Sequence, residues 1–143
     1  MNASASTAAR PLNGVTVIET SSFLTGPFAT LMLADLGADV IKVEPPGGDG
    51  FRRFGHNRQG FGASWTNANR GKRSVVIDLK TPEGLARLKE LLATADVLVE
   101  NWRPRVSDAL GLGNEVVSAI NPRLIRLSIT GFGTTGALAN APA

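Results

Sequence analysis

The sequence predicts an α/β fold with a mostly parallel sheet, and three observations lead to that prediction. Short β-branched apolar runs alternate along the chain with longer stretches of helical periodicity. The first of these runs is mostly apolar, as expected of a strand that is buried on both faces. The length of 143 residues suits one domain rather than two, because a chain of this size can bury a sizeable core.

The first βαβ unit is expected within residues 15–44. Residues 15–19 predict a strand, and residues 39–44 predict a second strand that a right-handed crossover joins to the first. Pro27 is expected to open the intervening helix, since the first turn does not need its missing N–H, and Gly37 to end it. The buried face of that helix is predicted from apolar residues at helical spacing, namely Phe28, Leu31, Met32 and Leu36.

The second half of the chain continues the alternation after a long gap. Residues 45–70 are glycine-rich with little periodicity and predict a loop of the length that is usually functional or mobile. Thr81 is expected to cap a helix with Pro82 at its first position and a stripe of leucines on its buried face. The other expected elements are strands at residues 74–78, 95–100 and 123–129 and short helices at residues 106–110 and 114–120.

The positive charge is concentrated in one segment. The formal net charge is +3, but residues 51–80 hold seven basic side chains against one acid, and the rest of the chain is net negative. This distribution favours a local anion site over the uniformly basic surface of a nucleic-acid-binding protein. A solvated basic loop is the alternative interpretation.

Composition excludes several other classes. The absence of cysteine leaves no disulfide framework or thiolate nucleophile and favours a reducing compartment, the cytoplasm. A single histidine, His56, argues against a histidine-based metal site and a Ser-His-Asp triad. Residues 1–10 are rich in alanine and serine and are expected to form a disordered tail. No run of about 20 apolar residues predicts a transmembrane helix, so no membrane partner is expected.

Three motifs at predicted strand ends carry candidate chemistry. Residues 69–74 and Lys80 place cations around a glycine, a pattern that suits a phosphate, unless the arginines pair with nearby acids instead. Residues 100–104 set a tryptophan beside an amide and a guanidinium, which suits a nucleotide base, unless the tryptophan packs under the next helix. Residues 131–136 match G-x-G-x-x-G, but the helix and acid of a dinucleotide fingerprint do not follow. Glu44 stands where such enzymes place a ribose-binding acid, although a lone acid there is more often solvated.

Longer motifs carry a family resemblance that covers roughly residues 11–136. They are residues 11–15, 25–30, 33–44, 69–75, 78–84, 95–101, 110–113, 121–125 and 131–136. Together they resemble the N-terminal part of the class III CoA-transferases, the family of formyl-CoA transferase, carnitine CoA-transferase and the 2-methylacyl-CoA racemases. The resemblance implies a Rossmann-like CoA-binding domain over residues 11–143, incomplete relative to the interlocked-ring fold of the family, and a homodimer for the full-length protein.

The resemblance also implies ligands and site residues. It implies coenzyme A as the acyl carrier, with an acyl-CoA and a carboxylic acid as substrates, and it requires neither a metal nor nucleic acid. Lys72 and Arg73 are added from their charge as candidate phosphate contacts. The CoA contacts that the resemblance implies are Leu24, Thr25, Ile77, Asp78, Leu79, Lys80, Asn101, Trp102 and Arg103.

The sequence departs from the family pattern in ways that affect function. Pro45 and Ala109 stand where the family often has arginines, each worth roughly 1.5–3 kcal/mol if it formed a charged hydrogen bond, and Arg105 is a candidate replacement. The transferases use an aspartate beyond the 131–136 string, which forms a mixed anhydride, and the racemases use a His/Asp pair there. No residue matches either, so no catalytic residue is assigned, and the chain alone is expected to be inactive and to expose apolar surface. A racemase of the same family, a non-catalytic nucleotide-binding or assembly module and a nucleotide oxidoreductase are the alternatives.

Overall fold

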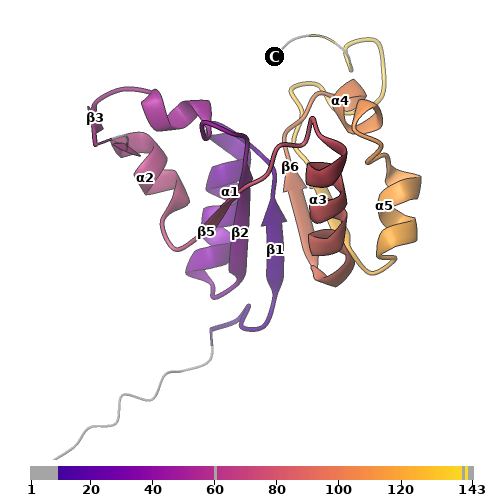
Figure 1. Ribbon diagram of the computed structural model, residues 1–143, viewed down its shortest axis with the longest axis horizontal. Coiled ribbons are helices and arrows are strands. Elements are labelled where there is room, and N and C mark those ends of the chain that lie inside the picture. Colours follow the sequence, from indigo (N-terminus) through magenta and orange to yellow (C-terminus); the bar gives the residue numbers. More distant parts are fainter. Residues whose placement is uncertain (1–9, 60, 140, 142–143) are drawn as a thin grey trace, which may run out of the picture.

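The computed structural model describes residues 10–59, 61–139 and 141, so the tail predicted at residues 1–10 lies almost wholly outside the described residues. At its centre is a five-stranded sheet in the order β5-β2-β1-β6-β7. Every neighbouring pair in this sheet is parallel, which confirms the predicted α/β class (Figure 1). The strands are β1 (Thr16–Glu19), β2 (Asp39–Glu44), β5 (Arg73–Val76), β6 (Val97–Glu100) and β7 (Ile125–Ser128).

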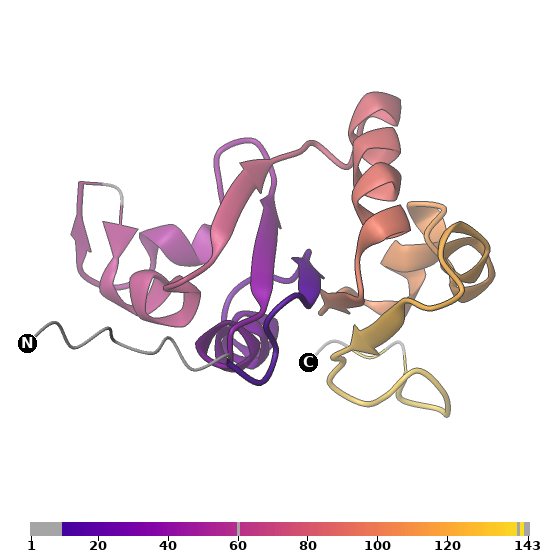
Figure 2. The ribbon, with the colours of Figure 1, turned by 90° about the horizontal axis from the view of Figure 1, so that it is seen from below.

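Helices cover both faces of the sheet. Figure 2 shows α1 (Thr25–Asp35) on one side of the strands and α3 (Pro82–Thr94) on the other, where α5 (Asn114–Ile120) lies beside α3. The short α4 (Pro104–Ala109) follows β6. None of the helices in the described ranges has the length and apolar character needed to cross a membrane.

Alternate residues of the central strands build two cores. Val17 and Ile18 are both fully buried, because β1 is covered on both faces as its apolar sequence predicts. Ile18 belongs to the cluster under α3 and α5, which includes Leu88 and Leu92, whereas Val17 packs with Ala34 of α1. The side chains of consecutive strand residues point to opposite faces, and this alternation divides the core between the two helical layers.

The predicted helix ends agree with the structure where capping chemistry sets them. Thr81 Oγ1 accepts a hydrogen bond from Gly84 N at 3.0 Å, and Pro82 begins α3. Gly37 follows α1 with φ +106°, and a Cβ there would lie 2.5 Å from Arg10 Cβ. Glycine therefore satisfies both the left-handed backbone and the close approach of the N-terminal segment.

The predicted buried face of α1 is wrong. Phe28 and Met32 are each 55% exposed and Leu36 is 45% exposed, whereas of the predicted set only Leu31 is buried. The helix begins at Thr25, before Pro27, and turns small residues toward the sheet, which lets the two approach closely. Its buried residues are Gly26, Pro27, Thr30, Leu31 and Ala34.

The segment of residues 45–70, predicted as one long loop, contains four short elements. They are η1 (Gly50–Arg53), β3 (Asn57–Arg58), β4 (Phe61–Gly62) and α2 (Ala63–Asn69). A small core of Phe51, Trp65 and Ala68 holds them together. Each element is shorter than two periods of its own structure, so the hydrophobic pattern could not reveal it.

The exposed stripe on α1 leads to a prediction about association. Leu24, Phe28, Met32 and Leu36 recur at intervals of four residues and are all about half exposed. We expect this face to drive concentration-dependent self-association of the chain, because contiguous apolar surface of this kind is unfavourable in water. Sedimentation velocity checks it, and the double variant Phe28→Lys/Met32→Lys should shift the distribution toward the monomer. A monomer that unfolds cooperatively and stays dispersed without these substitutions would contradict the prediction.

Candidate functional site

The order of the strands locates the candidate site. Counted along the chain without the β3–β4 hairpin, the sheet order is the Rossmann order, in which connections run outward from the first strand in both directions. The direction reverses between β1 and β6, and ligands of open α/β sheets bind outside the carboxyl ends of the strands at this point. A pocket of about 330 Å³ lies there, lined by Thr25, Asn101, Trp102, Arg103, Ile129, Thr130, Gly131, Phe132, Ala139 and Ala141.

Asn101 joins the two loops that flank the switch point. Its Nδ2 donates to Ser22 O at 2.9 Å, and its Oδ1 accepts from Ser22 N at 3.0 Å. Nδ2 also lies 3.4 Å from Thr25 Oγ1. Most of the amide's hydrogen-bonding capacity is therefore used to fasten the loop after β1 to the end of β6. Sequence reasoning named Asn101 as a ligand contact, and the structure gives it this additional structural role.

Trp102 combines the two interpretations that the sequence left open. It packs in part against the core under α3, and it also lines the pocket. Its backbone N donates to Glu100 Oε2 at 2.8 Å, which fixes the direction of the chain as it leaves β6. One part of the indole is therefore packed, while another part is available to an adenine or another flat group.

Residues 77–80, which follow β5, offer a ligand less side-chain surface than the family resemblance implied. Ile77 is buried in the core with Leu88 and Leu98, and Leu79 packs against the same cluster. The buried side chain of Ile77 is not available to a ligand, and that of Leu79 is available only in part. Asp78 Oδ1 accepts the backbone N–H of Lys80 at 3.0 Å and shapes a turn there, and the Lys80 side chain is exposed.

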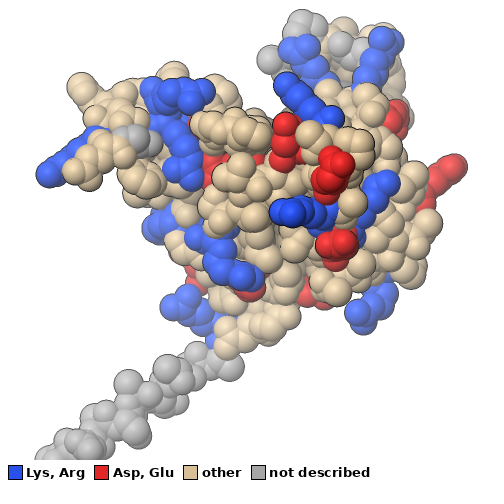
Figure 3. Space-filling view, viewed as in Figure 1, with Lys and Arg blue, Asp and Glu red and all other residues tan. Residues whose placement is uncertain are grey.

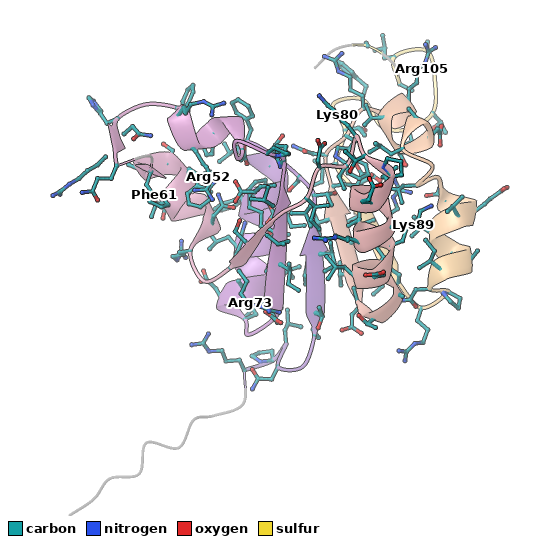
Figure 4. The ribbon with its side chains drawn as sticks, viewed as in Figure 1. Arg52, Phe61, Arg73, Lys80, Lys89 and Arg105 are labelled. Carbon is teal, nitrogen blue, oxygen red and sulfur yellow. The ribbon has the colours of Figure 1, made fainter. Side chains whose placement is uncertain are left out.

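Lys72 and Arg73 are held away from the pocket. The Lys72 side chain is 2% exposed, and its Nζ contacts Glu19 Oε2 at 2.8 Å and Pro27 O at 2.8 Å. Arg73 starts β5 at the opposite end of the sheet from Lys80 and pairs with Asp39, as Figure 4 places it. Neither residue joins the pocket, because nearby acids already neutralise both.

Most of the basic segment is paired in the same way. Arg70 pairs with Asp35, and Arg52 pairs with Glu44. The alternative in which these arginines bind neighbouring acids is therefore the one the structure adopts. Most basic side chains of residues 51–80 therefore form ion pairs within the fold, and they do not together form one open phosphate-binding site.

Three cations without an acidic partner in the described ranges remain at the strand-end edge: Lys80, Arg103 and Arg105. Figure 4 places Lys80 and Arg105 toward the same upper end of the molecule, and Arg103 lines the pocket. Figure 3 shows basic side chains gathered at this end, over α4. The sequence had proposed Arg105 as a replacement cation, and its position is consistent with that role.

A buried ion cluster lies beneath the site at the end of β1. Glu19 is fully buried, and its carboxylate meets Lys42 Nζ at 2.9 Å and Lys72 Nζ at 2.8 Å. Thr30 Oγ1 donates to it as well, at 2.6 Å. Burial acts to raise the pKa of Glu19, but the two lysines and these hydrogen bonds outweigh it and lower that pKa. The sequence signal for this cluster was a lysine between apolar residues in the middle of a strand.

A second buried carboxylate, Glu44, ends β2. Arg52 donates to it from Nε and Nη2, both at 2.7 Å, and Ser74 Oγ and Asp49 N donate at 2.6 and 2.9 Å. Burial alone would raise the pKa of Glu44, but these hydrogen bonds lower it from 4.5 to about 2. The expectation of a solvated acid is wrong, because four donors occupy the carboxylate. The same contacts leave little acceptor capacity for a ribose hydroxyl and argue against the dinucleotide hypothesis.

Glu100, at the end of β6, is also occupied. Ser128 Oγ donates to its Oε1, and Arg126 Nη2 lies 3.2 Å from the same oxygen. These residues line a second, smaller pocket of about 210 Å³, which shares Trp102 and Arg103 with the first. Within the ranges that the structure describes, no cluster of three or more acidic or histidine side chains is arranged to hold a metal ion.

Sequence reasoning missed part of the pocket wall. Ile129, Thr130, Gly131 and Phe132 line it, although the 131–136 string had been weighed only as a dinucleotide fingerprint and a family signature. The available signal was its place immediately after a strand, because parallel strands bring all such segments to one edge.

The parallel sheet, its strand order and its switch-point pocket define a Rossmann-like α/β domain. A family model described as CoA-transferase family III matches residues 12–143, so the chain belongs to this family, as the sequence motifs predicted. Among solved structures it is similar to a CaiB/BaiF family protein from Brucella suis, with a TM-score of 0.88 and 45% identity. That match covers 94% of this chain and 37% of the Brucella chain.

Curated relatives agree with the family. The chain is 47% identical over 134 residues to the succinyl-CoA–L-malate CoA-transferase beta subunit of Chloroflexus aurantiacus, covering 92% of this chain and 33% of that protein. It is 49% identical over 138 residues to the succinate–glutarate CoA-transferase of Agrobacterium fabrum, covering 91% of this chain and 34% of that protein. The chain thus spans about a third of the length of these relatives.

Proposed function

We propose that the chain is the CoA-binding N-terminal portion of a class III CoA-transferase. The observation that carries this proposal is the switch-point pocket, lined by Asn101, Trp102 and Arg103. Two more cations at the same edge, Lys80 and Arg105, have no acidic partner among the described residues. Coenzyme A presents an adenine, a diphosphate and a 3′-phosphate. A partly buried aromatic ring beside arginine and lysine side chains suits these groups.

In the complete enzyme we propose that CoA moves between carboxylic acids through a mixed anhydride. An aspartate attacks the thioester carbonyl, which forms a mixed anhydride and releases CoA as its thiolate. This portion retains the thiolate, which attacks the aspartyl carbonyl, so that the donor acid leaves and an aspartyl-CoA thioester forms. The acceptor carboxylate displaces CoA from that thioester to give a second mixed anhydride, and the thiolate then attacks the acceptor carbonyl, which forms the new acyl-CoA and restores the aspartate. The strand-end glutamates described above do not supply that nucleophile, because lysines hold Glu19, Arg52 holds Glu44 and Arg126 holds Glu100. We therefore propose that this portion binds CoA, that an aspartate in the remainder of the full-length protein completes the reaction, and that the full-length protein is a homodimer.

The relatives suggest a substrate class. The Chloroflexus and Agrobacterium proteins are named for transfers between succinate and malate or succinate and glutarate, and a third, from Acetobacter aceti, for acetyl-CoA and oxalate. We propose short dicarboxylic acids and their CoA thioesters as substrates, in a reducing compartment such as the cytoplasm. These names favour a transferase over a racemase of the same family.

Calorimetric titration of the chain tests the proposal. We expect CoA to bind at least about tenfold more tightly than dephospho-CoA, because the 3′-phosphate adds a charge-assisted hydrogen bond to an unpaired cation. NAD serves as the control ligand and should give no saturable heat. Binding of NAD without binding of CoA would overturn the proposal and support a nucleotide oxidoreductase.

A further inference from the structure

The loop that follows β1 holds an uncommon backbone conformation. Phe23 has φ +63°, a left-handed value that a bulky residue rarely adopts, and its side chain is 52% exposed. Packing of the ring in the interior therefore does not hold the backbone there. This loop leads directly into Leu24, whose exposed side chain does not line the candidate pocket, and into Thr25, which does.

Polar contacts from β2 and from Asp49, the N-cap of η1, fix this loop. Lys42 Nζ donates to Ser21 O at 2.9 Å, and Asp49 Oδ1 lies 3.4 Å from Phe23 N. A Cβ on Gly26 would lie 2.1 Å from Ser21 Oγ, so the start of α1 also sits directly on this loop. Asn101, which follows β6, also hydrogen-bonds Ser22. Successive residues of the loop are therefore held by side chains from β2 and from the end of β6.

Lys42 is the centre of these contacts. Its side chain is 1% exposed, and its ammonium lies 2.9 Å from Glu19 Oε1, 2.9 Å from Ser21 O and 3.1 Å from Asp49 Oδ2. Glu19 Oε1 and Ser21 O accept hydrogen bonds from the ammonium, whereas Asp49 Oδ2 meets it as an ion pair without a hydrogen bond. An apolar side chain would fill the same buried position without any desolvation cost, so burial alone does not account for a lysine.

Asp49 extends the cluster to the next segment. Its Oδ1 accepts from Phe51 N at 2.9 Å at the start of η1, and its own N–H donates to Glu44. The rings of Phe23 and Phe51 pack with centroids 5.6 Å apart. The loop after β1 and the segment after β2 are thereby joined into one unit on a shared buried charge cluster.

We propose that Lys42, acting with Asp49, is a positioning residue for the CoA site, an inference that rests on the proposed function. Lys42 holds the carbonyl of Ser21, and Asp49 holds the N–H of Phe23, so that the loop is already formed when the coenzyme arrives. A loop that is ordered before binding does not lose conformational freedom upon binding, and affinity rises accordingly.

The test compares affinity with loop order. Asp49→Asn keeps the size of the side chain but removes its charge, and we expect the Kd for CoA to rise about tenfold in calorimetric titration. Amide hydrogen exchange of Phe23 should accelerate without ligand, while the amides of β1 remain protected. Lys42→Met should act in the same direction. Asp49→Asn is the decisive variant because it disturbs the buried cluster less.

The matched control is Asn121→Ala. Asn121 is also buried, and its Nδ2 donates to Leu92 O and Ala95 O at the other end of the sheet. This variant should lose stability yet keep the Kd for CoA. Two results would overturn this inference without touching the proposed function. One is an equal weakening of CoA binding in Asn121→Ala. The other is an unchanged Kd and unchanged amide exchange in Asp49→Asn when the unchanged chain binds CoA. Absence of CoA binding to the unchanged chain would overturn the proposed function, and exchange at Phe23 would still report whether Asp49 orders the loop.

Discussion

Replacing Arg52 by methionine is expected to lower the free energy of unfolding by about 3–5 kcal/mol, because it leaves the buried carboxylate of Glu44 without its counter-ion. Arg52 supplies two of the four hydrogen bonds to that carboxylate. It also stacks on Trp65, with the guanidinium carbon 3.6 Å from the ring centroid, so the variant loses a cation–π contact as well. Denaturant unfolding monitored by tryptophan fluorescence measures the change.

The double variant Arg52→Met/Glu44→Gln distinguishes charge from packing. Glutamine removes the unpaired charge while keeping an acceptor for Ser74 or Asp49, so the double variant should regain a large part of the lost stability. Asp39→Asn is the surface control, since it breaks the exposed Arg73–Asp39 pair and should change stability by less than about 1 kcal/mol. A double variant no more stable than Arg52→Met would contradict the explanation.

The same pair predicts the pH dependence of stability. The pKa of Glu44 is lowered from 4.5 to about 2, so its contribution is fully present above pH 4.5 and is lost as the pH falls toward 2. In Glu44→Gln this part of the acid dependence should disappear, and the unfolding free energy should decline less steeply over that interval. The pKa of Glu19 is also lowered, so its part of the acid dependence of stability should remain in the unchanged chain and in Glu44→Gln alike.

Replacing Lys80 and Arg103 together by methionine is expected to weaken CoA binding by about a hundredfold or more, because each charged hydrogen bond to a phosphate is worth about 1.5–3 kcal/mol. Neither side chain has an acidic partner within the described part of the chain. Their replacement therefore leaves no acid without its counter-ion, and we expect little loss of stability. Titration at several salt concentrations checks this, since fewer phosphate contacts reduce the salt dependence.

The control for these cations is Lys89→Gln. Lys89 lies on α3, below the strand-end edge that Lys80 and Arg105 occupy (Figure 4). Its loss changes the net charge without touching the proposed phosphate site, so the affinity for CoA should stay within about twofold. Equal weakening in Lys89→Gln would mean that general charge attraction, and not a defined site, explains the binding.

The fold was predictable from sequence where the signal is local and repeated. The apolar runs that became β1, β2 and β6, the Thr81–Pro82 helix start and Gly37 all lie within a few residues of their predicted positions. The family motifs likewise agree with the matched family over nearly the whole chain. Strand burial and helix capping depend on neighbours in the chain, and so a single sequence carries them.

The partners of the charges were decided only by the tertiary structure. The sequence determined that the basic residues crowd into residues 51–80 and that Lys42 lies in an apolar strand. It could not determine that Lys72 reaches Glu19 across 53 positions, or that Arg73 lies at the opposite end of the sheet from Lys80. Ion pairs of this kind form between residues distant in sequence, and their geometry exists only once the sheet has brought the strands together. The same assembly turned the apolar stripe of α1 outward, because helix periodicity defines a face but not its direction.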